Sequence, residues 1–145
     1  MKRLHARLQR GSASNEALDD FLYFFLVCFH LKDWLAHHKE DTSVGEAAED
    51  LINTKDCLRV CADVANGTKH LVLDRYVRID PNARATAEPF FQAPFVQPGF
   101  GQETIVIRAA GEILLAFDVA NECVAAWEKL LRDKTLLPPK NEMTP

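Results

Sequence analysis

The chain has 145 residues, of which 48% are hydrophobic and 26% are charged, and its formal net charge is −4. This length fits one domain with a self-sufficient core, and the composition is that of a globular rather than a disordered protein. A general nucleic-acid coating protein would be more basic. The longest apolar run, Phe21 to Phe29, is too short to cross a bilayer, and no cleavable signal is indicated, so we expect a cytoplasmic protein.

The first segments predicted are a basic arm and a long helix. We expect residues 1–14 to be flexible, because this arm has little to pack on. Apolar residues then recur at helical spacing over residues 15–38 and cover nearly the whole circumference. A helix this apolar is either buried centrally or shared with a second subunit, so we predict a homodimer.

A second helix is predicted over residues 42–66. Thr42 or Ser43 can cap its start, with Glu46 in the reciprocal capping position, and Asn66-Gly67 is a typical helix stop. The two helices are therefore expected to form a long antiparallel hairpin.

The period of the apolar residues changes after this point. β-Branched and aromatic residues alternate over residues 70–80, which predicts a strand. Residues 81–102 contain four prolines, which predicts a long loop. Residues 104–108 and 113–117 predict a β-hairpin, and Asp118 is expected to cap a final helix to residue 133. We therefore predict an α+β fold, in which the helical hairpin and the C-terminal helix pack with a small three-stranded antiparallel sheet. A single globular domain would span residues 15–133, followed by a frayed tail over 134–145.

Four polar residues gather around the predicted end of the second helix, and they are the main candidate for a catalytic site. His70 suits general acid–base chemistry, because the pKa of an unperturbed imidazole is close to neutral. Lys69 can stabilise developing negative charge, and Asn66 and Asp63 can position the reacting groups. The alternative is structural, since His and Lys beyond a helix end also satisfy its free carbonyl groups.

Two sets of residues in the sequence are of types that can bind a metal. His30, Asp33 and His37 share one helix face, which suits either a divalent metal or a solvated helix end. The four cysteines, Cys28, Cys57, Cys61 and Cys123, contain no Cys-x-x-Cys pair and fit buried thiols of a reduced protein. We therefore assign no metal ligand and expect no cofactor.

The segment Asn66-Gly-Thr-Lys-His70, at the end of a long helical hairpin, resembles the end of the motif of the HEPN superfamily. These small helical domains are common in bacterial defence and toxin systems, and many are dimeric, metal-independent ribonucleases. The resemblance covers residues 15–70 and implies that His70 is catalytic and that Asn66 is the polar residue of the motif. The position of the family's arginine holds Ala65, so a non-cleaving member is the alternative.

Two functions follow. The first is an RNA-cleaving or RNA-binding domain, in which a local basic patch contacts the phosphates; the candidates for this patch are Arg59, Arg75, Arg78 and Arg84. The second is a non-enzymatic interaction module, such as an inhibitor, an antitoxin or a structural partner. It would bind a protein through the aromatic residues of loop 90–100 and the apolar first helix.

Overall fold

The computed structural model describes residues 1–9, 14–38, 43–69, 77–89 and 103–138. These residues form five helices and one three-stranded antiparallel sheet, so the predicted α+β class is confirmed. None of the described helices is both long enough and apolar enough to span a membrane. In chain order the elements are α1 (Lys2–Leu8), α2 (Ser14–Ala36), α3 (Ser43–Thr54), α4 (Asp56–Lys69), β1 (Arg84–Pro89), β2 (Glu103–Ala109), β3 (Glu112–Leu115) and α5 (Ala116–Asp133).

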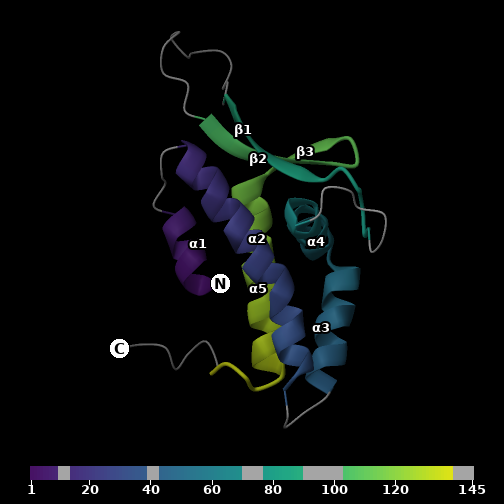
Figure 1. Cartoon of the computed structure of the whole chain (residues 1–145). Helices are drawn as coiled ribbons and strands as arrows, with labels where there is room; N and C mark the ends of the chain where they lie inside the picture. The colour runs from purple at the N-terminus through teal and green to yellow at the C-terminus, as the bar shows by residue number, and fades with distance from the viewer. Residues whose placement is uncertain (10–13, 39–42, 70–76, 90–102, 139–145) are drawn as a thin grey trace.

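Helix α2 runs through the middle of the molecule, and the sheet lies across one end of the helices (Figure 1). Phe24, Phe25 and Cys28 of α2 are completely buried and belong to one core with Leu58 of α4 and Trp127 of α5. On the opposite side of α2, Tyr23 and Trp34 are 56% and 79% exposed. The core therefore explains only part of the all-round apolar pattern of this helix, and the homodimer stays a prediction.

The segment expected to be one helix over residues 42–66 is two helices, α3 and α4, separated at Lys55. The Thr54 hydroxyl donates to the carbonyl oxygen of Asp50 at 2.7 Å, and a bond of this kind to the preceding turn often bends a helix. Asp56 then provides an acidic residue in the first turn of α4, where the helix dipole favours negative charge. The predicted stop at Asn66-Gly67 is also wrong, because α4 continues to Lys69.

The sheet uses a different first strand from the one predicted. Residues 70–76 lie outside the described residues, and residues 77–80 form no strand. Instead β1 lies within the segment that was predicted as loop, and it pairs with β2 from Arg84 opposite Arg108 to Pro89 opposite Glu103. The predicted hairpin is present as β2 and β3, and its turn residues Ala110 and Gly111 both have positive φ.

The N-terminal segment is a helix with its own packing, which corrects the expectation of an arm with little to pack on. Leu8 is buried, and the His5 ring stacks on Phe117 with ring centroids 6.2 Å apart. His5 Nε2 also lies 2.6 Å from Asn121 Oδ1 of α5. Helix α5 itself begins at Ala116, so Asp118 lies inside its first turn and is not the predicted cap. The last seven residues of the predicted tail, 139–145, lie outside the described residues.

The close approach of α3 to α2 depends on Gly45. A Cβ atom at this position would lie 2.7 Å from the Ala36 Cα, which is backbone and must move to make room. We expect Gly45→Ala to lower the free energy of unfolding by about 1–3 kcal/mol through overpacking. Alanine would otherwise gain about 1 kcal/mol over glycine in a helix, so a stabilised Gly45→Ala protein in urea denaturation would contradict this packing. Asp50→Ala, at an exposed position of the same helix, is the matched control.

Candidate functional site

Asp63 is a fully buried carboxylate in the middle of α4. Its Oδ1 accepts a hydrogen bond from the backbone N–H of Arg78 at 2.8 Å. Its Oδ2 accepts the N–H groups of Ile79 at 2.5 Å and Asp80 at 2.9 Å. These three bonds account for the burial of the charge and tie the segment before β1 to α4. Asp63 is thus a positioning residue for the backbone that follows residues 70–76.

Asp80 extends this network to the sheet. Its carboxylate accepts the N–H of Asn82 at 2.8 Å and the N–H of Ala110, in the β2–β3 turn, at 2.7 Å. Hydrogen bonds from these two backbone groups lower the pKa of Asp80 from its ordinary value. Asp63 and Asp80 together connect α4, the segment before β1 and the hairpin turn.

The other predicted catalytic residues lie at the end of α4. Asn66 is half-buried and Lys69 is exposed, whereas His70 lies outside the described residues. Asp63 and Lys69 do not converge, because six residues turn an α-helix by about 600°, which leaves the two side chains about 120° apart. Asp63 faces residues 78–80, and Lys69 instead lines a groove between α1 and α2.

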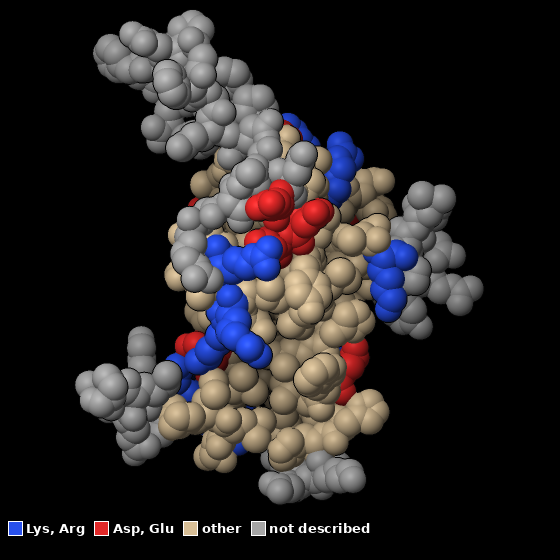
Figure 2. All heavy atoms as spheres, turned by 60° about the vertical axis from the view of Figure 1, so that its left-hand side comes forward, with Lys and Arg blue, Asp and Glu red and all other residues tan. Residues whose placement is uncertain are grey.

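This groove has a volume of about 1160 Å³. Its lining combines apolar, aromatic and basic side chains, which are those of Met1, Lys2, Arg3, Leu4, Arg7, Tyr23, Leu26, Val27, His30, Leu31, Trp34 and Lys69. On this side of the molecule, Lys and Arg side chains lie on both sides of an uncharged surface (Figure 2). The groove therefore contains the exposed aromatic rings of Tyr23 and Trp34 together with Lys and Arg side chains.

The cations of the groove differ in their availability. Lys2 pairs with Glu128 at 2.9 Å and Arg7 pairs with Asp20 at 2.7 Å. In the described part of the chain, Arg3 and Lys69 make no ion pair. These two charges are therefore free to bind an anionic ligand.

The predicted phosphate-binding arginines lie elsewhere. Arg59 donates to Asp56 Oδ1 at 3.0 Å and to the carbonyl oxygen of Arg78 at 2.7 Å. Arg78 forms an ion pair with Glu49 at 3.0 Å and lies over the Phe29 ring. Arg84 is exposed at the start of β1, and Arg75 lies outside the described residues. The structure does not bring Arg59, Arg78 and Arg84 into the groove with Lys69.

The candidate metal ligands His30, Asp33 and His37, at and just beyond the end of α2, are held by other bonds. His30 Nδ1 lies 2.8 Å from Asp33 Oδ2, but His37 Nδ1 lies 2.6 Å from the backbone oxygen of Asp33. Lys32 also pairs with the Asp33 carboxylate at 3.1 Å. Among the residues that the structure describes, these three side chains are not a group with convergent ligand atoms.

A different cluster of possible ligands lies in the core. The Sγ atoms of Cys28, Cys61 and Cys123, from α2, α4 and α5, all lie within 4.8 Å of one another, and all three residues are buried. Burial raises the pKa of Cys61, and hydrogen bonding with its cysteine neighbours raises that of Cys123. Burial also acts to raise the pKa of Cys28, but the neighbouring thiols of Cys123 and Cys61 hold it well below its ordinary value.

Sequence reasoning did not find this cluster, because its members are separated by long stretches of chain. The available signal was that each of the three helices carries a cysteine on its apolar face. Comparisons of the chain with protein-family models, characterised proteins and solved structures gave no significant match.

Asp63→Asn tests the role of the buried carboxylate. The amide nitrogen of asparagine would face a backbone N–H that now has an acceptor, so we expect the free energy of unfolding to fall by about 2–4 kcal/mol. Urea denaturation followed by circular dichroism measures this change. Asp50→Asn, an exposed aspartate on α3, should stay within about 0.5 kcal/mol of the wild type. Equal effects of the two substitutions would contradict the role given to Asp63.

The lowered pKa of Asp80 predicts a pH dependence of stability. The unfolded carboxyl has a pKa of about 3.9, and the folded value is lower, so the stabilisation is complete above the unfolded value and is lost as pH falls through the folded value. The free energies of unfolding of the wild type and Asp80→Asn should differ most at neutral pH, and this difference should become smaller in acid. Asp118→Asn, which removes an exposed carboxylate of α5, is the control. A difference that grows in acid would be the opposite of this expectation.

Proposed function

We propose that this protein is a HEPN-like, metal-independent RNA-binding or RNA-cleaving domain that uses the α1–α2 groove and the end of α4. The observation that supports this most is the combination, in one groove, of two exposed aromatic rings and two cations without an ion pair. Grooves that bind single-stranded nucleic acid use this combination, because aromatic rings stack on bases while basic side chains follow the phosphates.

In this proposal, unpaired bases stack on Tyr23 and Trp34, and Arg3 and Lys69 contact the phosphates. Each stacked base contributes about 1–3 kcal/mol in comparable proteins. The net charge of −4 is compatible with this, because binding depends on the local surface rather than on the whole chain.

The proposed chemistry takes place at the end of α4. His70 directly follows Lys69 in the chain, and Lys69 lines the groove. As a general base, His70 would remove the proton of a ribose 2′-hydroxyl, whose oxygen then bonds to the adjacent phosphorus while the bond from phosphorus to the 5′-oxygen breaks. The products are a 2′,3′-cyclic phosphate and a 5′-hydroxyl, because the leaving 5′-oxygen takes up a proton from water. Lys69 would stabilise the negative charge that develops on the phosphate oxygens, and Asn66 would help to position the group. Asp63 acts at a distance, through the backbone of residues 78–80.

A protein-interaction module is the second candidate. Trp34 and Tyr23 are exposed, and the apolar Leu26, Val27 and Leu31 line the same groove, which also suits an apolar helix of another protein. Residues 90–100, the other predicted contact, lie outside the described residues. This candidate predicts no dependence on a 2′-hydroxyl and little dependence on salt.

RNA binding and cleavage test the proposal directly. We expect the affinity for a single-stranded RNA to fall as salt rises, and Lys69→Ala to reduce the magnitude of the slope of log K against log salt by about 0.7, the value for one phosphate contact. Trp34→Ala should weaken binding about 5- to 150-fold through lost stacking. His70→Ala should abolish cleavage in EDTA while the protein stays folded and still binds RNA.

Lys55→Ala, an exposed lysine between α3 and α4, is the matched control and should leave both readouts unchanged. An equal change of the slope in Lys55→Ala and Lys69→Ala would contradict a specific groove. A folded wild type that neither binds nor cleaves several RNAs would favour the interaction module.

A further inference from the structure

Three thiols from three separate helices meet in the centre of the core. Cys28 comes from α2, Cys61 from α4 and Cys123 from α5, and their Sγ atoms lie within 4.8 Å of one another. Three sulfur atoms that each lie about 2.3 Å from a shared metal ion are about 4 Å apart. Small rotations of the side chains are therefore enough to bring the three sulfurs into a common coordination sphere.

The surroundings of the cluster contain a donor suited to thiolates. Trp127 is completely buried, and its indole Nε1–H has no hydrogen-bond partner in the described part of the chain. Trp127 belongs to the same buried core as the three cysteines. A buried N–H of this kind is typical of the outer shell of a metal site and is not explained by packing alone.

We propose that Cys28, Cys61 and Cys123 bind one monovalent copper ion, Cu(I), in a three-sulfur site. Thiolates are soft ligands, and they select Cu(I), zinc or iron–sulfur clusters over hard cations. Structural zinc almost always has four ligands, whereas the convergent group here contributes three, with no fourth His, Cys, Asp or Glu among the described residues. Cu(I) is stable with three sulfur ligands, and the apolar core favours it over a hydrated divalent ion.

Binding must also balance charge. Each thiol releases one proton as its sulfur bonds to the metal, so three thiols and one Cu(I) give a three-thiolate complex and three protons. No oxidant or reductant takes part, because the ion enters and remains as Cu(I).

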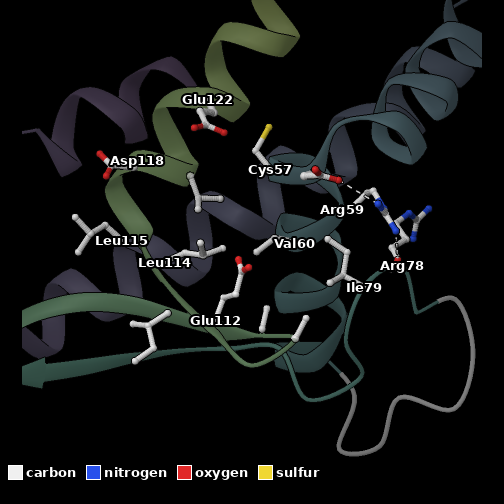
Figure 3. Close-up of a pocket in the computed structure, with 15 residues that line it drawn as sticks. Cys57, Arg59, Val60, Arg78, Ile79, Glu112, Leu114, Leu115, Asp118 and Glu122 are labelled. Carbon is white, nitrogen blue, oxygen red and sulfur yellow. Dashed lines mark hydrogen bonds and ion pairs between the residues drawn. The ribbon is translucent and has the colours of Figure 1, made fainter.

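A second hollow of about 790 Å³ has Cys57 in its lining but none of Cys28, Cys61 and Cys123. Its walls include the carboxylates Glu112, Asp118 and Glu122, which attract cations, and Cys57 lies opposite Glu122 (Figure 3). The Cys123 thiol donates a hydrogen bond to the backbone oxygen of Cys57 at 3.3 Å. Cys57 therefore separates the acidic hollow from the buried sulfurs and is not itself part of the three-sulfur set.

The test is anaerobic titration of the reduced, full-length protein with Cu(I), in competition with a coloured Cu(I) chelator. We expect one ion per chain, and X-ray absorption of the wild-type complex should show sulfur neighbours only, three in number. Cys61→Ser and Cys123→Ser should each lower the Cu(I) affinity at least tenfold, with folding checked by circular dichroism. Trp127→Phe should weaken binding about 10- to 100-fold, as the loss of an outer-shell partner does.

Cys57→Ser is the matched control, because it removes a thiol next to the cluster and should leave the Cu(I) affinity unchanged. No Cu(I) uptake by folded wild type would overturn the proposal, as would uptake that survives Cys61→Ser and Cys123→Ser in folded protein. A parallel titration with Zn(II) distinguishes a copper site from a zinc site. Zinc binding that requires Cys57, without Cu(I) binding, would overturn the proposal and assign a four-thiolate zinc site instead. If the serine variants do not fold, the number of sulfur neighbours that X-ray absorption finds around the ion in the wild-type complex still tests the three-sulfur site.

Discussion

The attachment of the sheet to α4 depends on the hydrogen bonds that the Asp63 carboxylate accepts. This carboxylate is a fully buried charge, and three backbone N–H groups of residues 78–80 stabilise it. Because such a charge is costly without partners, the helix and the segment before β1 have to form together. Asp80 carries the same constraint to the β2–β3 turn, so one short stretch of chain fixes the sheet to α4.

This constraint also shapes the region around the candidate site. The segment that contains His70 leaves α4 at Lys69 and returns to the same helix at Arg78, where Asp63 holds it. Lys69 lines the groove of aromatic and basic side chains, whereas Arg78 does not. The polar end of α4 and Cys61 in its middle, the one member of the thiol cluster that this helix carries, lie at separate places on the helix.

Elements with strong periodicity were predictable, and those fixed by partners distant in the chain were not. The apolar spacing of α2 and α5 and the hairpin of β2 and β3 were evident in the sequence. Strand β1 was missed because its alanines give no apolar alternation, and its state depends on pairing with β2. The break at Lys55 was missed because the sequence there contains no strong helix breaker. The partners of Asp63 and the meeting of three cysteines are tertiary, and no local spacing encodes them.

The central claim is that the α1–α2 groove, beside the end of α4, is an RNA site. Ultraviolet cross-linking of the wild-type protein to a single-stranded RNA, followed by mass spectrometry of the linked peptides, tests it most directly. The account predicts cross-links in the peptides that contain Tyr23, Trp34 or Lys69, and their loss when unlabelled RNA competes. Competable cross-links confined to other surfaces, such as the exposed Arg84 end of β1, would contradict it.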